Sequence, residues 1–218
     1  DIYNKYKNKI IARYDLRRFI NDGYSKKVFR LQANNDDETK MLNAVLLSQY
    51  RKHLASDLGI PNFKPVILFK SNSVPLSKKT TEVFLSMIAN LTAESLERFI
   101  NTQSRSIDSE ALKITYDYWN KQNYGETVSE LKKDFQRYTT VNANDSTQKS
   151  ILDDSYIGKR LNTLESPKNP IRAIFAVAKL SEGWDVLNLY DIVRIGEKNI
   201  GQSETNSEAQ LIGRGARY

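Results

Sequence analysis

Two short runs of apolar residues stand out against an otherwise mixed chain. They are residues 66–69 (VILF) and 173–178 (AIFAVA). Because neither run alternates with polar residues, each predicts a strand buried on both faces, as in a parallel sheet. Residues 190–195 (YDIVRI) predict a third strand, and residues 138–141 (YTTV) predict a weaker fourth.

Apolar residues at helical spacing fill most of the chain between these runs. The predicted helices are 38–58, 78–90, 92–101, 108–121, 126–137 and 150–164. Asp36 and Asp37 can cap the first of them, and the second-last starts at Glu126-Thr127. The candidate buried positions of the first helix are Met41, Ala44, Val45, Leu47, Leu54 and Leu58.

The N-terminal segment differs in character. Residues 2–20 mix aromatic, apolar and basic side chains at roughly helical spacing, and Asn21-Asp22-Gly23 ends that helix. Residues 27–31 predict a short strand. Residues 1–35 hold nine Lys/Arg and three Asp/Glu, so they carry +6 of the net charge of +7. Such a segment suits a polyanionic partner, although a solvated helical face explains it equally well.

Strands that alternate with helices predict an α/β domain with a mainly parallel sheet. Ligands of such sheets bind at the carboxyl ends of the strands. This rule points to three loops, at residues 70–73, 179–188 and 196–207.

Composition excludes several kinds of chemistry. The 218 residues contain no cysteine and one histidine, His53, so they can build neither a Ser–His or Cys–His catalytic set nor a Cys- or His-based metal site. We expect His53 to be solvated or to cap its helix. No apolar run is long enough to span a membrane and no signal peptide is evident, so we expect a cytoplasmic protein.

The last residues, NSEAQLIGRGARY, predict a short helix with a distinct chemistry. Ser207 and Gln210 match a capping box at its start. Gln210, Arg214 and Arg217 are spaced i, i+4 and i+7, so they share one face and present two guanidinium groups suited to phosphate oxygens. Gly213 suggests a close approach to the backbone. The alternative is a flexible basic tail.

The segment 180–185 (LSEGWD) follows a predicted buried strand, where a ligand loop belongs. Gly183 permits an unusual backbone angle or a close approach. Asp185 has a carboxylate that can accept hydrogen bonds from a ribose or orient arginines. The alternative is a structural turn with Trp184 buried and Asp185 as a cap.

Together these segments resemble the second RecA-like lobe of superfamily 2 helicases. Residues 178–185 (AKLSEGWD) resemble motif V, residues 210–217 (QLIGRGAR) resemble motif VI, and residues 66–73 are similar to motif IV. The sequences of the motif V and motif VI segments are most similar to those of the Res subunit of type III restriction enzymes. Val177 departs from the pattern, because many superfamily 2 proteins have a nucleic-acid-contacting Thr there.

The resemblance implies a role for each matching residue. Arg214 and Arg217 would contact the γ-phosphate of ATP, at least one as an arginine finger, and Gln210 would position the nucleotide or the attacking water. The nucleotide-binding positions would be Gly183, Asp185 and Gly213. The DNA backbone would be contacted by Lys70, Ser71 and Asn72.

The resemblance also implies an organisation. Residues 1–35 would be a linker or arm, and residues 36–218 the second lobe, with a helical insertion at about 92–164. The chain has neither a G-x-x-x-x-G-K-[ST] segment nor an Asp-Glu box for magnesium. We therefore expect the first lobe, which would bind most of the ATP and Mg²⁺, to precede Asp1 in a longer protein, and the fragment alone to be inactive.

The expected partners are DNA, the first lobe and a modification methyltransferase subunit, with no membrane. Two other functions stay open from the sequence. One is an RNA helicase or DNA-repair helicase lobe, and the other is a nucleic-acid-binding module without catalysis.

Overall fold

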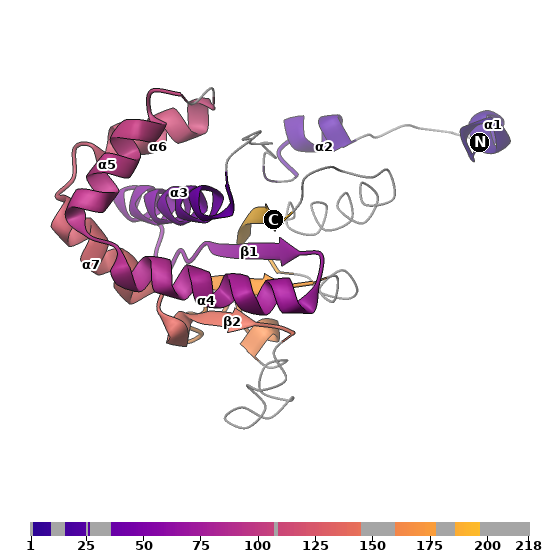
Figure 1. Ribbon diagram of the computed structural model, residues 1–218. Helices are drawn as coiled ribbons and strands as arrows, with labels where there is room; N and C mark the ends of the chain where they lie inside the picture. The colour runs from indigo at the N-terminus through magenta and orange to yellow at the C-terminus, as the bar shows by residue number, and fades with distance from the viewer. Residues whose placement is uncertain are drawn as a thin grey trace.

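The chain is described here by a computed structural model (Figure 1). It describes residues 2–9, 16–24, 26, 36–106, 109–144, 160–177 and 186–196. Within these residues, four parallel strands form one sheet in the order β2-β3-β1-β4. Their bounds are β1 (Val66–Ser71), β2 (Thr140–Asn142), β3 (Ala173–Ala176) and β4 (Leu189–Ile195).

The described helices surround this sheet and extend beyond it. Their bounds are α1 (Ile2–Tyr6), η1 (Lys7–Lys9), α2 (Leu16–Asn21), α3 (Asp37–Asp57), α4 (Val74–Asn90), α5 (Ala93–Gln103), α6 (Glu110–Trp119), α7 (Tyr124–Asp134) and η2 (Arg137–Thr139). Residues 160–162 are also helical. The predicted α/β architecture with a parallel sheet flanked by helices is confirmed.

The central strand β1 is buried on both faces, as its apolar run predicts. Ile67 and Phe69 face a core formed with α3, α4, α5, α6 and α7. Val66 and Leu68 face a second core, which includes Leu161 and Leu164. The aromatic rings of Phe69 and Phe175 stack with their centroids 4.7 Å apart on the first face. Each of the positions 66–69 therefore faces one of the two cores.

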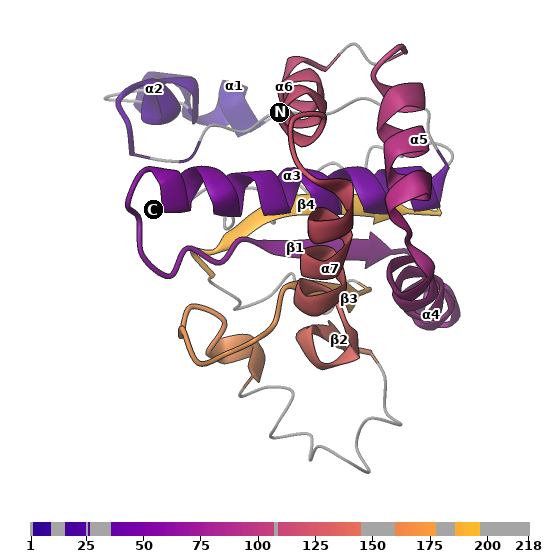
Figure 2. The ribbon, with the colours of Figure 1, turned by 90° about the vertical axis from the view of Figure 1, so that its left-hand side faces the viewer.

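Helix α3 lies across β1 and β4 on the first face of the sheet (Figure 2). Residues 41–49 are all buried, because α6 packs against α3 and α4, which also contacts the sheet, packs beside it. Of the six predicted core positions, Leu54 and Leu58 are wrong, with 42% and 68% of their surfaces exposed. Leu54 and Leu58 lie on the exposed side of the helix, whereas Ala55 between them is buried.

Two helices begin earlier than their patterns predict. Helix α4 begins at Val74, because Pro75 lacks only an N–H that is unpaired in the first turn of any helix. Helix α7 begins at Tyr124, capped by Asn123, whose Oδ1 accepts hydrogen bonds from the N–H groups of Gly125 (2.8 Å) and Glu126 (3.1 Å).

The three helices α5, α6 and α7 lie on the side of the molecule from which β1 points away (Figure 1). Because the sheet is parallel, all four carboxyl ends lie on the opposite side of the molecule. No helix in the described part of the chain is long and apolar enough to cross a membrane. The predicted strand at 27–31 and helix at 207–218 lie outside the described residues.

Candidate functional site

The carboxyl edge of the sheet carries the residues predicted to contact DNA. Lys70 and Ser71 are the last residues of β1, and Asn72 follows directly. Asn72 is exposed and Lys70 is partly exposed, so both side chains reach solvent. Ser71 is buried with 2% of its surface exposed, and its Oγ has no hydrogen-bond partner among the described residues. The structure therefore brings the three residues to one edge but presents only two of them to solvent.

The start of α4 adds a favourable environment for an anion beside Asn72. Ser73 is the N-cap residue, and its side chain makes no capping hydrogen bond. The first N–H groups of a helix lack partners within the helix and carry a partial positive charge. Together with the ammonium group of Lys70, they make this corner of the edge suited to phosphate oxygens.

The end of β2 contributes two asparagines that the sequence did not single out. Asn142 is buried, and its Nδ2 donates to Thr81 Oγ1 (2.8 Å) and Ser77 Oγ (3.2 Å) of α4. Its Oδ1 accepts from the N–H of Asn144 at 2.9 Å. Asn144 Oδ1 in turn accepts from the N–H of Val177 at 2.7 Å. We call Asn142 and Asn144 the asparagine clasp, because they join α4, β2 and the end of β3.

The end of β4 is held by contacts that require glycine. Gly196 has φ +74°, and a Cβ there would lie 2.4 Å from Cδ2 of Leu76 in α4. The N–H of Gly196 donates to Asp37 Oδ2 at 2.9 Å, which ties β4 to the first turn of α3. The neighbouring cap Asp36 accepts from the N–H of Thr39 at 2.9 Å, and this hydrogen bond lowers the pKa of Asp36.

The two segments that resemble motifs V and VI follow Val177 and Gly196, the residues held by these contacts. Gly183 and Asp185 follow Val177, while Gln210, Gly213, Arg214 and Arg217 follow Gly196. All six lie outside the described residues, so their predicted roles remain predictions. What the structure adds is that the two segments leave the same edge of the sheet, which also carries Lys70 and Asn72.

The opposite, amino edge holds a buried group of charges. Arg172, 3% exposed, donates to Asp134 Oδ2 (2.6 Å), to the carbonyl of Pro65 (2.9 Å) and to Ser48 and Gln49 (both 3.2 Å). Burial alone would raise the pKa of Asp134, but the charges of Arg172 and of Lys52 outweigh it and lower that pKa. The guanidinium also lies 4.8 Å from the ring centroid of Phe135.

The prediction for His53 is wrong. Its side chain is 26% exposed. Nδ1 lies 2.7 Å from the hydroxyl of Tyr118, and Nε2 lies 2.8 Å from Glu130 Oε2. These partners come from α6 and α7, which fold back over the end of α3, so His53 joins helices rather than capping one. No local sequence signal could have shown this.

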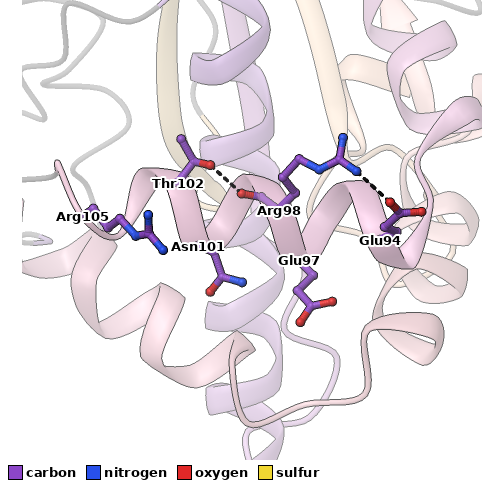
Figure 3. Close-up of a pocket in the computed structure, with 6 residues that line it drawn as sticks. All are labelled: Glu94, Glu97, Arg98, Asn101, Thr102 and Arg105. Atoms are coloured by element: carbon purple, nitrogen blue, oxygen red, sulfur yellow. Dashed lines mark hydrogen bonds and ion pairs between the residues drawn. The ribbon is translucent and has the colours of Figure 1, made fainter.

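A hollow of about 420 Å³ lies away from the carboxyl edge, along α5 and the turn that follows it (Figure 3). Its lining mixes acidic, basic and amide side chains, namely Glu94, Glu97, Arg98, Asn101, Thr102 and Arg105. Glu94 and Arg98 form an exposed ion pair at 2.7 Å. Because one segment supplies the whole lining and two of its charges pair with each other, we assign no ligand to the hollow.

The described residues contain no group of three or more His, Asp or Glu side chains that could hold a metal ion.

Comparison with known proteins finds a relative over nearly the whole chain. No family model matches, and no solved structure matches. The chain is 36% identical over 222 aligned residues to a protein of Haemophilus influenzae described as a probable type III restriction-modification enzyme HindVIP Res subunit. The alignment covers 95% of this chain and 43% of the relative, so the chain spans less than half of that protein's length. The predicted similarity to the Res subunit of type III restriction enzymes is therefore confirmed along nearly the whole chain.

Proposed function

We propose that the chain is the second motor lobe of an ATP-dependent DNA translocase, within a type III restriction endonuclease Res subunit. The observation that carries this proposal is the 36% identity to a Res subunit along 95% of the chain. The topology supports it. The carboxyl ends of the strands lie at one edge of the sheet, where Lys70 and Asn72 lie and where the chain continues from β3 toward Asp185 and from β4 toward Arg214.

In this proposal the lobe completes an ATP site whose other half lies on the first lobe. Arg214 and Arg217 would reach the γ-phosphate, and at least one would stabilise the charge that develops during phosphoryl transfer. Gln210 would position the nucleotide or the attacking water. Asp185 would hold the ribose or the arginines, with Gly183 and Gly213 allowing close approach. Mg²⁺ would be bound mainly by the first lobe.

The DNA half of the proposal uses the corner between β1 and α4. Lys70 and Asn72 would contact the phosphate backbone, which is independent of base sequence. Ser71 is buried, and its Oγ has no partner within the described part of the chain, so it would contact a phosphate only if this corner opened slightly. ATP binding would draw the two lobes together around these contacts, and hydrolysis would release them. A modification methyltransferase subunit would be the further partner.

The test is DNA-stimulated ATP hydrolysis by the full-length protein. We expect Arg214→Ala or Arg217→Ala to lower kcat by about 10³-fold, the loss typical of an arginine finger. Arg98→Ala is the matched control, since Arg98 is exposed on α5 and paired only locally with Glu94. Near-normal kcat in both motif variants would refute the proposed function.

A further inference from the structure

We propose that Asn144 is a positioning residue for the nucleotide-binding segment that follows β3. The inference rests on the proposed function, because that function gives the segment after β3 its nucleotide-binding role. Asn144 itself is assigned no contact with the nucleotide. It concerns the hydrogen bond from the N–H of Val177 to Asn144 Oδ1, at 2.7 Å.

The position of this bond in the sheet is what gives it significance. β3 pairs with β2 only as far as Phe175, and with β1 as far as Ala176. The N–H of Ala143 donates to the carbonyl of Phe175 at 2.9 Å. Val177 lies beyond the last ladder pair, so a side chain takes over where strand pairing stops. Asn144 thereby fixes the backbone one residue beyond the last strand pair, on the side that leads to Gly183 and Asp185.

Asn144 is itself held in place rather than free to move. Its own N–H donates to Asn142 Oδ1 at 2.9 Å. Asn142 is 1% exposed, and its Nδ2 donates to Ser77 and Thr81 of α4. Thr81 Oγ1 in turn donates to the carbonyl of Ser77 at 2.8 Å. The clasp therefore connects the exit of β3 to α4, the helix whose first turn follows Lys70 and Asn72.

The chemistry of each asparagine predicts which replacement it tolerates. The printed side-chain bond of Asn144 uses only its Oδ1, as an acceptor. A carboxylate at this position would accept the same bond, so Asn144→Asp should retain it. Asn142 uses its Oδ1 as an acceptor and its Nδ2 as a donor. Asn142→Asp would therefore lose the Nδ2 group that donates to Ser77 and Thr81 of α4.

The first arm of the experiment is amide hydrogen exchange of the full-length protein, followed on peptides that end on either side of Val177. We expect Asn144→Leu, which is similar in size but has no acceptor, to accelerate exchange of the Val177 amide by about 10-fold, as for one lost hydrogen bond. Asn144→Asp should restore the wild-type rate. Asn90→Leu is the control, since Asn90 is exposed at the far end of α4 and bonds only Ser86.

The second arm is steady-state ATP hydrolysis with saturating DNA. A segment that is less well positioned should bind ATP more weakly, so Asn144→Leu should raise KM for ATP by about 5- to 10-fold with kcat little changed. Asn144→Asp should rescue KM. This differs from the expected signature of Arg214→Ala, which is a lower kcat, so the two proposals can fail separately.

Each outcome decides the proposal. Faster exchange together with a raised KM, both rescued by Asp, supports it. Unchanged exchange in Asn144→Leu overturns the contact. Faster exchange with an unchanged KM, or a fall in kcat alone, overturns the positioning role while Arg214→Ala still tests the motor function. If Asn144→Leu does not fold, Asn144→Ala carries the same comparison.

Discussion

Arg172 shows how one residue ties the helical layer to the sheet. It directly precedes β3, and its guanidinium bonds Asp134 of α7, two residues of α3 and the carbonyl before β1. A charge removed from water in this way is stable only when all its donors find partners. Within the described residues, Arg172 is therefore the point where three elements of the amino edge meet.

We expect Arg172→Met to destabilise the fold by about 3–5 kcal/mol, because it leaves Asp134 buried without its main partner. Urea denaturation would measure the loss. Arg137→Met is the control, since Arg137 pairs with Glu82 on the surface, and such exposed pairs contribute about 0–1 kcal/mol. Equal effects of the two substitutions would show that the Arg172 contacts do not hold the helical layer.

Lys64 makes the stability depend on pH. Its ammonium group donates to the carbonyls of Ser166 and Asn169, and burial, with a smaller contribution from the charge of Arg172, lowers its pKa from 10.5 to about 8. Below about pH 8 the folded and unfolded chains both hold the proton. Above it the unfolded chain binds more protons, so the contribution of Lys64 to stability rises with pH.

The prediction is a rise in unfolding free energy between about pH 8 and pH 10 that is smaller in Lys64→Met. Part of the rise stays in that variant, because burial also lowers the pKa of Lys26 to about 8. The range ends at pH 10 because burial raises the pKa of Tyr116 above 10.0, and its contribution falls at higher pH. Urea titrations at several pH values would measure the difference between the two proteins. Lys113→Met, at an exposed position, should keep the wild-type rise. A variant curve parallel to that of wild type would contradict the burial of Lys64.

At the scale of elements, apolar runs predicted the strands of the sheet. The exact bounds of β2 and the buried positions of α3 depend on tertiary packing. The runs at 66–69 and 173–178 became β1 and β3, because continuous apolar residues fit a strand covered on both faces. The weak pattern at 138–141 became β2, shifted to Thr140–Asn142, because Arg137–Thr139 form a 3₁₀ turn first. Leu54 and Leu58 failed as core positions because they lie on the exposed side of the helix.

The same distinction applies to the candidate site. Lys70 and Asn72 were predictable, because polar residues directly after a buried strand must lie at the carboxyl edge. The asparagine clasp was not predictable, since the hydrogen-bond partners of Asn142 and Asn144 lie in α4 and at Val177, which are distant in sequence. His53 likewise depends on partners in α6 and α7, 65 and 77 residues away.

The corner between β1 and α4 has a testable electrostatic signature. We expect Lys70→Ala in the full-length protein to weaken duplex DNA binding and to lower the slope of log affinity against log salt by about one, because one phosphate contact is lost. Fluorescence anisotropy across a salt series would measure both values. Lys113→Ala should change neither, since Lys113 lies on α6 in the helical layer. An unchanged slope in Lys70→Ala would remove this residue from the DNA contacts.

At the scale of the whole molecule, the proposed contacts with DNA and ATP lie at the opposite edge of the sheet from the buried ion pair of Arg172 and Asp134. The amino edge is packed with helices and joined by Arg172, Asp134 and His53. The carboxyl edge carries Lys70 and Asn72, the clasp, and the two exits at Val177 and Gly196. This division is consistent with the proposed lobe, whose carboxyl edge would complete a site on a partner lobe.

ATP hydrolysis, compared between the full-length protein and the 218-residue chain, tests this account most directly. We expect the full-length protein to hydrolyse ATP at a rate that duplex DNA increases. The 218 residues alone should show no turnover, with or without DNA, because they contain no phosphate-binding G-x-x-x-x-G-K segment. ATP turnover by the isolated chain, or full-length turnover that duplex DNA does not change, would contradict the account.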